Sequence, residues 1–561
     1  MTSYTSDRMA DCRDLKTFAL WAIAAGAFVL PGAVTIGRGT QPIRHRGAMN
    51  ETTTVGALEH RIISALRVVV PVVIVCFYLW RIFGGLAPVE RFSDDFFYYA
   101  VPARNWVDGA GSTFFPGEPT NGYHPLWFLW VALLYRVAGG GVIFFGLADL
   151  TLMALLVGFF LVFERFLRRV TGDRLAAAVG AAVAAVSLTV VSRAGVEVAL
   201  AAFATALLLD YLSRKPLADQ TVRDAAIVGL LGAFLVLARL DAVFLAPGLV
   251  VAVISRWDWR RLSAVVVGAV PVYAYLVFNL VVYGHLGTSS MAAKSLDVYW
   301  PPNLWFLEFP SRVVMSGVVA TVLVVSVVVG VMLRRSENAD VRRIALALAV
   351  APVLQLAAQA LFSGWTLFPW YFYFFVMVLG VAAALVFMGL RRWNALRWAG
   401  IPLGAVMLLV AGLGLVAGEK PDPWQRDAAA NAARLQAFSV DHPGVYAMGD
   451  AAGTPEWTIG LPIVHLEGLM MSPDFVDRIR ERQPLEQVFR DYHVDYYVAV
   501  RPADNPTDGC LQFAEPTPQQ ASPRAPHLTT TICSAPVKVI QTGDRNRLQV
   551  YRVDPTTGKV V

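Results

Sequence analysis

The stretch RVVVPVVIVCFYLWRIFGGLAPVERFSDDFFYYAVPARNW, residues 67–106, begins as an apolar run and continues into an acidic pair, Asp94 and Asp95. An apolar run of about 17 to 25 residues is long enough to cross the hydrocarbon core of a bilayer as a helix. The run at about 66–86 therefore predicts a spanning helix that delivers both carboxylates to one membrane surface. The rest of the chain indicates which surface this is.

The composition is typical of a polytopic membrane protein. Of the 561 residues, 56% are hydrophobic and 16% charged, and the mean hydropathy is +0.54. Soluble globular domains carry about 25% charged residues. Apolar runs of spanning length recur up to about residue 417, and the hydropathy then falls. We expect an N-terminal, cytoplasmic extension over 1–65, a membrane domain over 66–420 and a soluble domain over 421–561.

The positive charge is explained by membrane topology, and we expect no nucleic-acid partner. The net charge is +6 and the pI about 9.1, but the basic residues gather in short clusters between apolar runs. Such clusters mark the cytoplasmic ends of membrane helices. The five clear ones are RFLRRVTGDR (165–174), SRKPLADQTVR (213–223), SRWDWRR (255–261), RRSENADVRR (334–343) and RRWNALR (391–397).

If all five clusters are cytoplasmic, the apolar runs between them must cross outward and return in pairs, and they do. A final run at about 398–417 then leaves the soluble domain outside the cytoplasm. Together with the runs at 66–86 and 143–164, this predicts about eleven spanning helices. The paired runs lie at about 175–191 and 198–213, 225–238 and 241–255, 262–283 and 313–333, and 343–361 and 370–390.

Two further apolar segments do not fit this alternation. The segment 125–138 is short for a crossing and begins with Pro125 at a natural first helical position, so we expect a helix at the outer interface. The segment 17–37 is long enough to span, but from inside it would place the arginines that follow on the outer side. We expect an extra segment with Met49 as the true start; a spanning helix with an outer N-terminus is the alternative.

With this topology, the uncommon polar residues of the membrane domain gather at the outer helix ends. Ionisable groups at membrane depth are costly and indicate a functional site. Cations suit the phosphate of an anionic substrate, and a carboxylate suits proton abstraction from an attacking hydroxyl. The residues are Asp94, Asp95, Arg104, Asn121, His124, Arg193, Glu197, Arg239, Asp241, His285 and Lys294.

The segment SDDFFYYAVPARNWVDGAGSTFFPGEPTNGYHPLW (93–127) resembles the first outer loop of the GT-C superfamily, membrane glycosyltransferases that use polyprenyl-phosphate-linked sugars. GVEVAL (195–200), ARLDA (238–242) and YGHLGTSSMAAKS (283–295) resemble later signatures of its bacterial branch. The resemblance covers roughly residues 66–420. Two departures are Val196, where the branch has methionine, and the missing proline before Thr288.

This resemblance implies an all-α polytopic membrane domain with a C-terminal extracytoplasmic α/β domain. It implies transfer of a hexosyl or pentosyl group from a polyprenyl phosphate to a cell-envelope glycan, lipid or protein, with inversion, at the outer face of the cytoplasmic membrane. Asp94 or Asp95 would be the general base, and the other would bind a divalent cation, Mg²⁺ or Mn²⁺. The implied substrate-binding residues are Asn121, Tyr123, His124, Glu197, Arg239, Asp241 and Lys294, with Arg239 and Lys294 on the donor phosphate.

Structural interpretations stay open for each of these residues. Asp94 and Asp95 can favour the start of a helix through its dipole, and Arg239 with Asp241, or Glu197 with Arg193, can form an ion pair. Two other functions stay open as well: a polymerase or ligase with a polyprenyl-diphosphate donor, and a transporter. A transporter is expected to carry internal repeats and polar groups at mid-membrane. The sequence shows no convincing repeat, and its polar residues lie at the outer helix ends.

The soluble domain shows strands alternating with helices. Helices are expected at 423–438 and 473–492, and the loop 501–529 is expected to be partly mobile. GDAAGTPEW (449–457) offers a backbone that can cradle an anion, although a structural role is favoured there and for Asp450 and His465. Cys510 and Cys533 either pair as a disulfide, if the domain faces an oxidising compartment, or stay free thiols. The expected strands are 444–449, 462–468, 494–500, 537–542 and 547–553.

Overall fold

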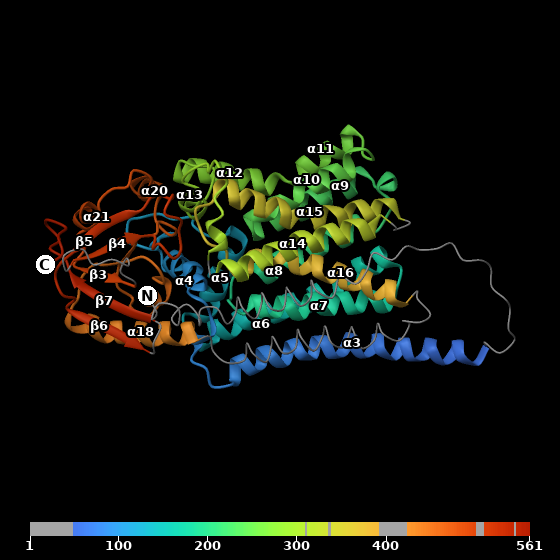
Figure 1. The fold of residues 1–561 in the computed structure, drawn as a ribbon, viewed down its shortest axis with the longest axis horizontal. Helices are drawn as coiled ribbons and strands as arrows, with labels where there is room; N and C mark the ends of the chain where they lie inside the picture. Colours follow the sequence, from blue (N-terminus) through green and yellow to red (C-terminus); the bar gives the residue numbers. More distant parts are fainter. Residues whose placement is uncertain (1–48, 309–310, 335–337, 392–422, 501–509, 543–545) are drawn as a thin grey trace.

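The computed structural model describes residues 49–308, 311–334, 338–391, 423–500, 510–542 and 546–561. The apolar segment 17–37 and the last predicted span, 398–417, lie outside these residues. A bundle of helices occupies one part of the molecule, and a mixed helix and strand domain lies beyond one end of it (Figure 1).

Every predicted span in the described residues forms a helix. Six helices there are long and apolar enough to cross a membrane, and α11 with α12, bent by 49°, makes a seventh if the pair is one span. The other three predicted spans, at 198–213, 225–238 and 241–255, form shorter helices because the chain turns at Glu197 and at Arg239. Helix length and hydropathy therefore identify up to seven spans among the described residues, against eleven predicted for the chain. The long helices are α3 (Met49–Phe83), α6 (Val142–Thr171), α7 (Arg174–Ser192), α14 (Arg312–Leu333), α15 (Ala339–Phe362) and α16 (Tyr373–Arg391), which η5 (Pro369–Phe372) precedes; the others are α8 (Val198–Leu212), α9 (Val222–Ala238), η3 (Leu240–Leu245), α10 (Ala246–Ile254), α11 (Trp259–Gly268) and α12 (Val270–Tyr283).

The most deeply buried spanning helix is α7, which is rich in alanine. In its apolar window 94% of the residues are buried, against 22% for α3. Small residues let membrane helices approach closely. A Cβ added at Gly180 would lie 2.4 Å from the carbonyl oxygen of Gly380, so α7 and α16 pack backbone against backbone. Either glycine replaced by a larger residue would push these helices apart.

Short elements cover the end of the bundle that faces the second domain (Figure 1). The helix predicted at 125–138 is present as α5 (Pro125–Ala138), with the proline in its first turn. The entry to α4 is fixed by the buried Asp149 of α6, whose oxygens lie 3.1 Å from Arg81 Nε and 3.1 Å from Arg91 Nη1. The short elements are η1 (Pro88–Arg91), α4 (Asp94–Val107), α5, α13 (Ser289–Lys294) and η4 (Trp305–Leu307), and η2 (Leu217–Asp219) lies at the other end.

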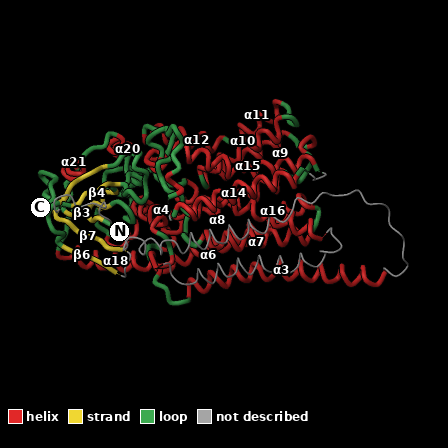
Figure 2. Tube along the Cα trace, viewed as in Figure 1, coloured by secondary structure: helices red, strands yellow, loops and turns green. Residues whose placement is uncertain are grey.

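The soluble domain is an α/β unit, as predicted. Its main sheet has the order β2-β1-β3-β7-β6, in which β1 runs parallel to β2 and β3 while β7 is antiparallel to β3 and β6. The strands gather in this domain, beyond the end of the helix bundle (Figure 2). All five expected strands are present in this sheet. The elements are α18 (Pro423–Asp441), β1 (Tyr446–Met448), α19 (Gly453–Ile459), β2 (Ile463–His465), α20 (Pro473–Arg480), α21 (Leu485–Asp491), β3 (Tyr496–Ala499), β4 (Leu511–Glu515), β5 (Leu528–Ile532), β6 (Lys538–Thr542) and β7 (Asn546–Arg552).

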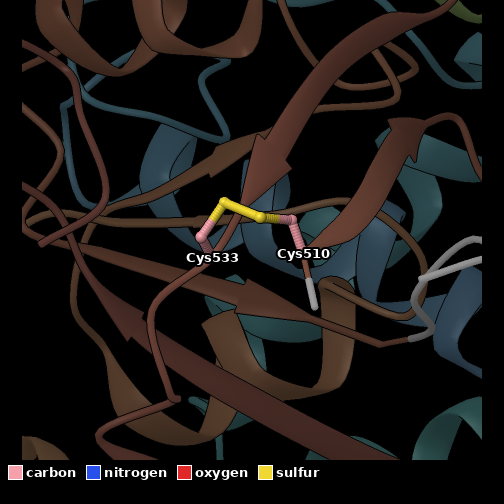
Figure 3. Close-up of a disulfide and its surroundings, with 2 residues drawn as sticks. All are labelled: Cys510 and Cys533. Atoms are coloured by element: carbon pink, nitrogen blue, oxygen red, sulfur yellow. A yellow bond between two sulfur atoms is a disulfide. The ribbon is translucent and has the colours of Figure 1, made fainter. Parts of the chain in front are cut away.

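Two details of the soluble domain differ from the prediction. The single helix expected over 473–492 is broken into α20 and α21, because Arg482 adopts a positive φ of 56° and Pro484 follows. The segment expected as a loop contains β4, which pairs antiparallel with β5. A disulfide joins Cys510 to Cys533 beside this pair, so the free-thiol alternative is wrong (Figure 3).

Candidate active site

The two adjacent acids of the first loop have different surroundings. Asp94 Oδ1 accepts a hydrogen bond of 2.6 Å from the backbone N–H of Thr454, and Oδ2 accepts one of 3.1 Å from Gly453. These donors begin α19 in the segment that the sequence suggested as an anion cradle, and the anion it holds is Asp94. A Cβ at Gly453 would lie 2.7 Å from the Asp94 carbonyl oxygen, so the close approach needs glycine. Asp94 therefore fastens the soluble domain to α4.

Asp95 instead faces a pocket of about 80 Å³ between the bundle and the soluble domain. Burial raises the pKa of its carboxyl to about 7; the nearby Asp94, Glu197 and Asp450 also raise it, whereas Lys294 lowers it. The pocket is lined by Asp95, Tyr98, Tyr99, Gly122, Tyr123, His124, Val196, Glu197, Arg239, Thr288, Ser290, Lys294, Trp370, Tyr371, Leu469 and Met470.

Arg239 is held by two carboxylates. Its Nη1 pairs with Glu197 Oε1, and its Nε and Nη2 donate to the two oxygens of Asp241 at 2.8 and 3.1 Å. The guanidinium lies 5.2 Å from the ring centre of Tyr371 and 5.3 Å from that of Tyr373. Such a bidentate, stacked arrangement suits arginine and not lysine. The ion-pair interpretation of Arg239 with Asp241 is what the structure shows, with Glu197 as a further partner.

His124 directs both ring nitrogens at the protein. Its Nδ1 accepts the backbone N–H of Leu240 at 3.1 Å, which puts the proton of the neutral ring on Nε2. Nε2 lies 3.4 Å from Glu197 Oε1. Burial lowers the pKa of His124 and so favours this neutral form. The ring therefore orients Glu197 and the Arg239 segment.

Lys294 lines the same pocket but, unlike Arg239, is not held by carboxylates of the described residues. Its Nζ donates to the Tyr371 hydroxyl at 3.1 Å and lies 5.6 Å from the ring centre of Trp365. Among the described residues, none of the ion pairs within 4.0 Å involves Lys294. A compact ammonium with no carboxylate in contact is suited to bind an anion that enters the pocket.

Asn121 does not line the pocket but holds the helix that carries Lys294. Its Oδ1 accepts the Ser289 N–H at 2.9 Å and the Ser289 hydroxyl at 3.1 Å, while its Nδ2 donates to Gly287 at 3.2 Å. Two turns of chain that are far apart in sequence are thus joined at the start of α13. The neighbouring Tyr123 does line the pocket, and its ring stacks on Phe128 at 3.9 Å.

The structure thus brings six of the predicted site residues into one pocket and places three behind it. Asp94, Asn121 and Asp241 lie outside the lining, and Asp241 also accepts a hydrogen bond of 2.8 Å from Gln355. Glu197, for which sequence analysis left open an ion pair with Arg193, pairs with Arg239. The residues in the pocket are Asp95, Tyr123, His124, Glu197, Arg239 and Lys294.

The predicted divalent cation does not fit the acidic pair as the described residues arrange it. Both Asp94 oxygens are occupied by backbone N–H groups. The described part of the chain contains no group of three or more His, Cys, Asp or Glu side chains placed to hold a metal. We therefore assign no metal to Asp94 and Asp95.

Sequence reasoning missed the contribution of the soluble domain to the pocket. Leu469 and Met470 line it, and a Cβ at Gly122 would lie 1.8 Å from the Leu469 carbonyl oxygen. No motif marks these residues, because their role depends on how two domains dock. Tyr371 lies in the aromatic run 365–375, a weak signal because aromatic residues are common at the membrane interface.

No family model and no curated protein matches the sequence. Among solved structures, the chain is similar to ArnT from Cupriavidus metallidurans bound to undecaprenyl phosphate, with a TM-score of 0.51 and 14% identity over 76% of this chain and 92% of that one. The apo state of ArnT gives a TM-score of 0.50 and 16% identity over the same shares. An archaeal oligosaccharyltransferase, AglB from Archaeoglobus fulgidus in complex with an inhibitory peptide and a dolichol-phosphate, gives a TM-score of 0.47 and 12% identity over 77% of this chain and 69% of that one.

The likeness to ArnT confirms the predicted fold: a helical membrane domain with a C-terminal α/β domain. The apolar helices make the chain an integral membrane protein.

Proposed function

We propose that this chain is a glycosyltransferase that moves a sugar from a polyprenyl-phosphate donor to a hydroxyl of a cell-envelope acceptor. The observation that carries the proposal is the pairing, in one pocket, of a carboxylate with a pKa of about 7 and a lysine that no carboxylate of the described residues contacts. The fold likeness to a protein solved with undecaprenyl phosphate supports the same donor class.

Asp95 is the general base of the proposed reaction. A base works best when its pKa lies near the operating pH. Asp95 accepts the proton of the acceptor hydroxyl, whose oxygen forms a bond to the anomeric carbon of the donor. The bond between that carbon and the phosphate oxygen breaks, and its electron pair leaves with the polyprenyl phosphate. One displacement of this kind inverts the anomeric configuration.

Lys294 stabilises the charge that the leaving phosphate gains. A fixed cation in a pocket with little water acts more strongly there than in bulk solvent. Asn121 keeps α13, and with it Lys294, against the first loop. Arg239 is less suited to the phosphate than the sequence suggested, because Glu197 and Asp241 occupy its fork.

A polyprenyl monophosphate donor is favoured over a diphosphate. A diphosphate carries more negative charge, and the described pocket offers Lys294 as its one cation without a carboxylate contact. A transporter is disfavoured because the pocket lies at the end of the bundle that the soluble domain covers, where Leu469 and Met470 help to line it, and not at mid-membrane.

The soluble domain and the pocket are proposed to face the outside of the cytoplasmic membrane. Disulfides persist in oxidising compartments and are rare in the cytosol, and the Cys510–Cys533 disulfide lies in this domain. The basic clusters that sequence analysis placed in the cytoplasm include those at 165–174 and 213–223, at the opposite ends of α6 and α8 from the pocket.

Sugar transfer by the protein in reconstituted membranes tests the function. A panel of polyprenyl-phosphate and polyprenyl-diphosphate sugars is supplied with an envelope extract, and the glycosidic product is detected by mass spectrometry. We expect one monophosphate sugar to be transferred by the wild type and not by Asp95→Asn. Substrate passing through the membrane unchanged, or equal transfer by Asp95→Asn, would contradict the proposal.

A further inference from the structure

A second pocket lies at the other end of the helix bundle and has no part in the proposed reaction. Its volume is about 250 Å³. The 15-residue helix α8 starts beside the first pocket at Glu197 and ends at Leu212 beside the second, a helix length of about 22 Å. The pocket is lined by Arg169, Ser213, Arg214, Lys215, Pro216, Asn338, Asp340, Val341 and Ile344.

Four basic clusters that are far apart in the sequence converge at this pocket. Arg169 belongs to the first of them, and Arg214 and Lys215 belong to the second. Arg256 from the third and Arg343 from the fourth contact Asp340 in the wall, at 3.6 and 3.9 Å. Topology alone requires each cluster to lie on one side of the membrane. It does not require the clusters to surround a common hollow.

The cations here outnumber the carboxylates that neutralise them. Asp210 alone is shared by Arg165, Arg169 and Arg214, with distances of 3.9, 2.6 and 2.8 Å. Lys215 pairs with Asp224 at 3.2 Å. With Arg256 and Arg343 on Asp340, the described residues set six cations against three carboxylates. A surplus of positive charge remains around the pocket.

The pocket is also accessible and carries a hydroxyl. The side chains of Arg214 and Lys215 are 48% and 55% exposed, whereas Ser213 is buried behind them. The N-terminus of α15 at the same place is already capped, because Asn338 Oδ1 accepts the N–H groups of Asp340 and Val341 at 3.1 Å each. An arginine has five N–H donors and a lysine three, so Arg214 and Lys215 keep donors for a ligand beyond those that Asp210 and Asp224 accept.

We propose that this pocket binds the phosphate headgroup of an anionic phospholipid. A phosphate has the negative charge that the surplus requires, and arginine and lysine are the side chains that bind it best. Basic pockets between membrane helices are suited to such headgroups. The pocket lies at the ends of membrane helices, at the level of the lipid headgroups. The proposal is independent of the proposed transfer reaction.

The test is a lipid titration of the full-length, detergent-solubilised protein. Short-chain phosphatidylglycerol, short-chain phosphatidylcholine and inorganic phosphate are added separately, and bound lipid and the midpoint of thermal unfolding are measured. We expect phosphatidylglycerol to bind and to raise the midpoint, and Lys215→Gln to weaken its binding about fivefold. A matched control is Arg260→Gln, which removes one exposed cation that does not line the pocket and which should bind like the wild type.

Each outcome distinguishes the alternatives. Stabilisation by inorganic phosphate that Lys215→Gln also weakens would identify a free phosphate as a sufficient ligand, whereas an effect of phosphatidylglycerol alone identifies the lipid. Equal effects of the two lipids, or equal binding by the wild type and Lys215→Gln, would overturn the proposal. Arg214→Lys keeps the charge and should retain most of the binding, which separates charge from folding.

Discussion

Charged side chains gather at both ends of the helix bundle, but they are buried and paired at one end and partly exposed at the other. In the first pocket, Arg239 and Glu197 are both 3% exposed and neutralise each other. At the other end, Arg214 is 48% exposed and shares Asp210 with two further arginines. A buried charge requires a partner because desolvation is costly. An exposed charge does not, so at the second end the cations of the described residues can outnumber the carboxylates that they contact.

The largest expected effect on the rate of sugar transfer comes from replacing Asp95, the acid that faces the first pocket. Asp95→Asn should lower the rate of sugar transfer by about 10³-fold, since general bases contribute about 10² to 10⁴. Asp94→Asn is the matched variant: it leaves one oxygen for the two N–H groups of α19 and so weakens the docking of the soluble domain, but it keeps the base, and the loss of rate should be much smaller. Initial rates for the two purified variants decide between them, and equal losses would end the distinction between the two acids.

Removing Arg239 tests whether the buried charges at the first pocket depend on their ion-pair partner. Arg239→Met should destabilise the protein by about 3 to 5 kcal/mol, because it leaves Glu197 and Asp241 without their cation. Arg214→Met at the other end should cost about 1 kcal/mol or less, since Arg214 is half exposed and the buried Asp210 keeps Arg165 and Arg169 as partners. Thermal unfolding in the same detergent measures both. Similar midpoints for the two variants would contradict the contrast.

The position of Lys294 depends on a residue behind the pocket. Asn121→Ala removes the two hydrogen bonds to Ser289, each worth about 1 kcal/mol, and should raise the KM for the lipid donor about tenfold with a smaller change in kcat. Asn279→Ala is a control, because its amide donates to the Leu286 carbonyl, which precedes α13 in the same loop. A fall in kcat at unchanged KM would show that Asn121 does not act through donor binding.

The smallest expected effect is a shift of the pH profile. Asp95 must be ionised to accept a proton, so kcat/KM should fall about tenfold per pH unit below its pKa of about 7. Lys294 lowers this pKa, and Lys294→Gln should therefore move the acid limb to higher pH as well as weaken donor binding. The pH dependence of transfer by both proteins measures the shift, and a limb that moves to lower pH would have the wrong sign.

Local patterns allowed much of the fold to be predicted. The length of the apolar runs located the membrane helices, and the alternation of strand and helix patterns in the soluble domain located the five strands of the main sheet. The prediction was wrong where one residue changed the path of the chain, as at Arg482 between α20 and α21, and where a strand pair formed within an expected loop. Pairing between β4 and β5 is a contact between segments that neither segment encodes alone.

The candidate site could be predicted as a set of residues but not as an arrangement. Polar side chains are rare in a membrane domain, so Asp95, His124, Glu197, Arg239 and Lys294 were conspicuous in the sequence. Their partners were not, because a hydrogen bond such as that from Leu240 to His124 joins residues more than 100 positions apart.

The sequence by itself determined the class of protein, the candidate polar residues and the placing of the basic clusters, because hydropathy and charge act on each segment separately. Only the tertiary structure decided that Asp94 binds α19 while Asp95 faces the pocket, that Arg239 is occupied while Lys294 is not paired with a carboxylate of the described residues, and that Leu469 and Met470 complete the wall. These depend on which groups share a buried space, where each charge must find its partner from another part of the chain.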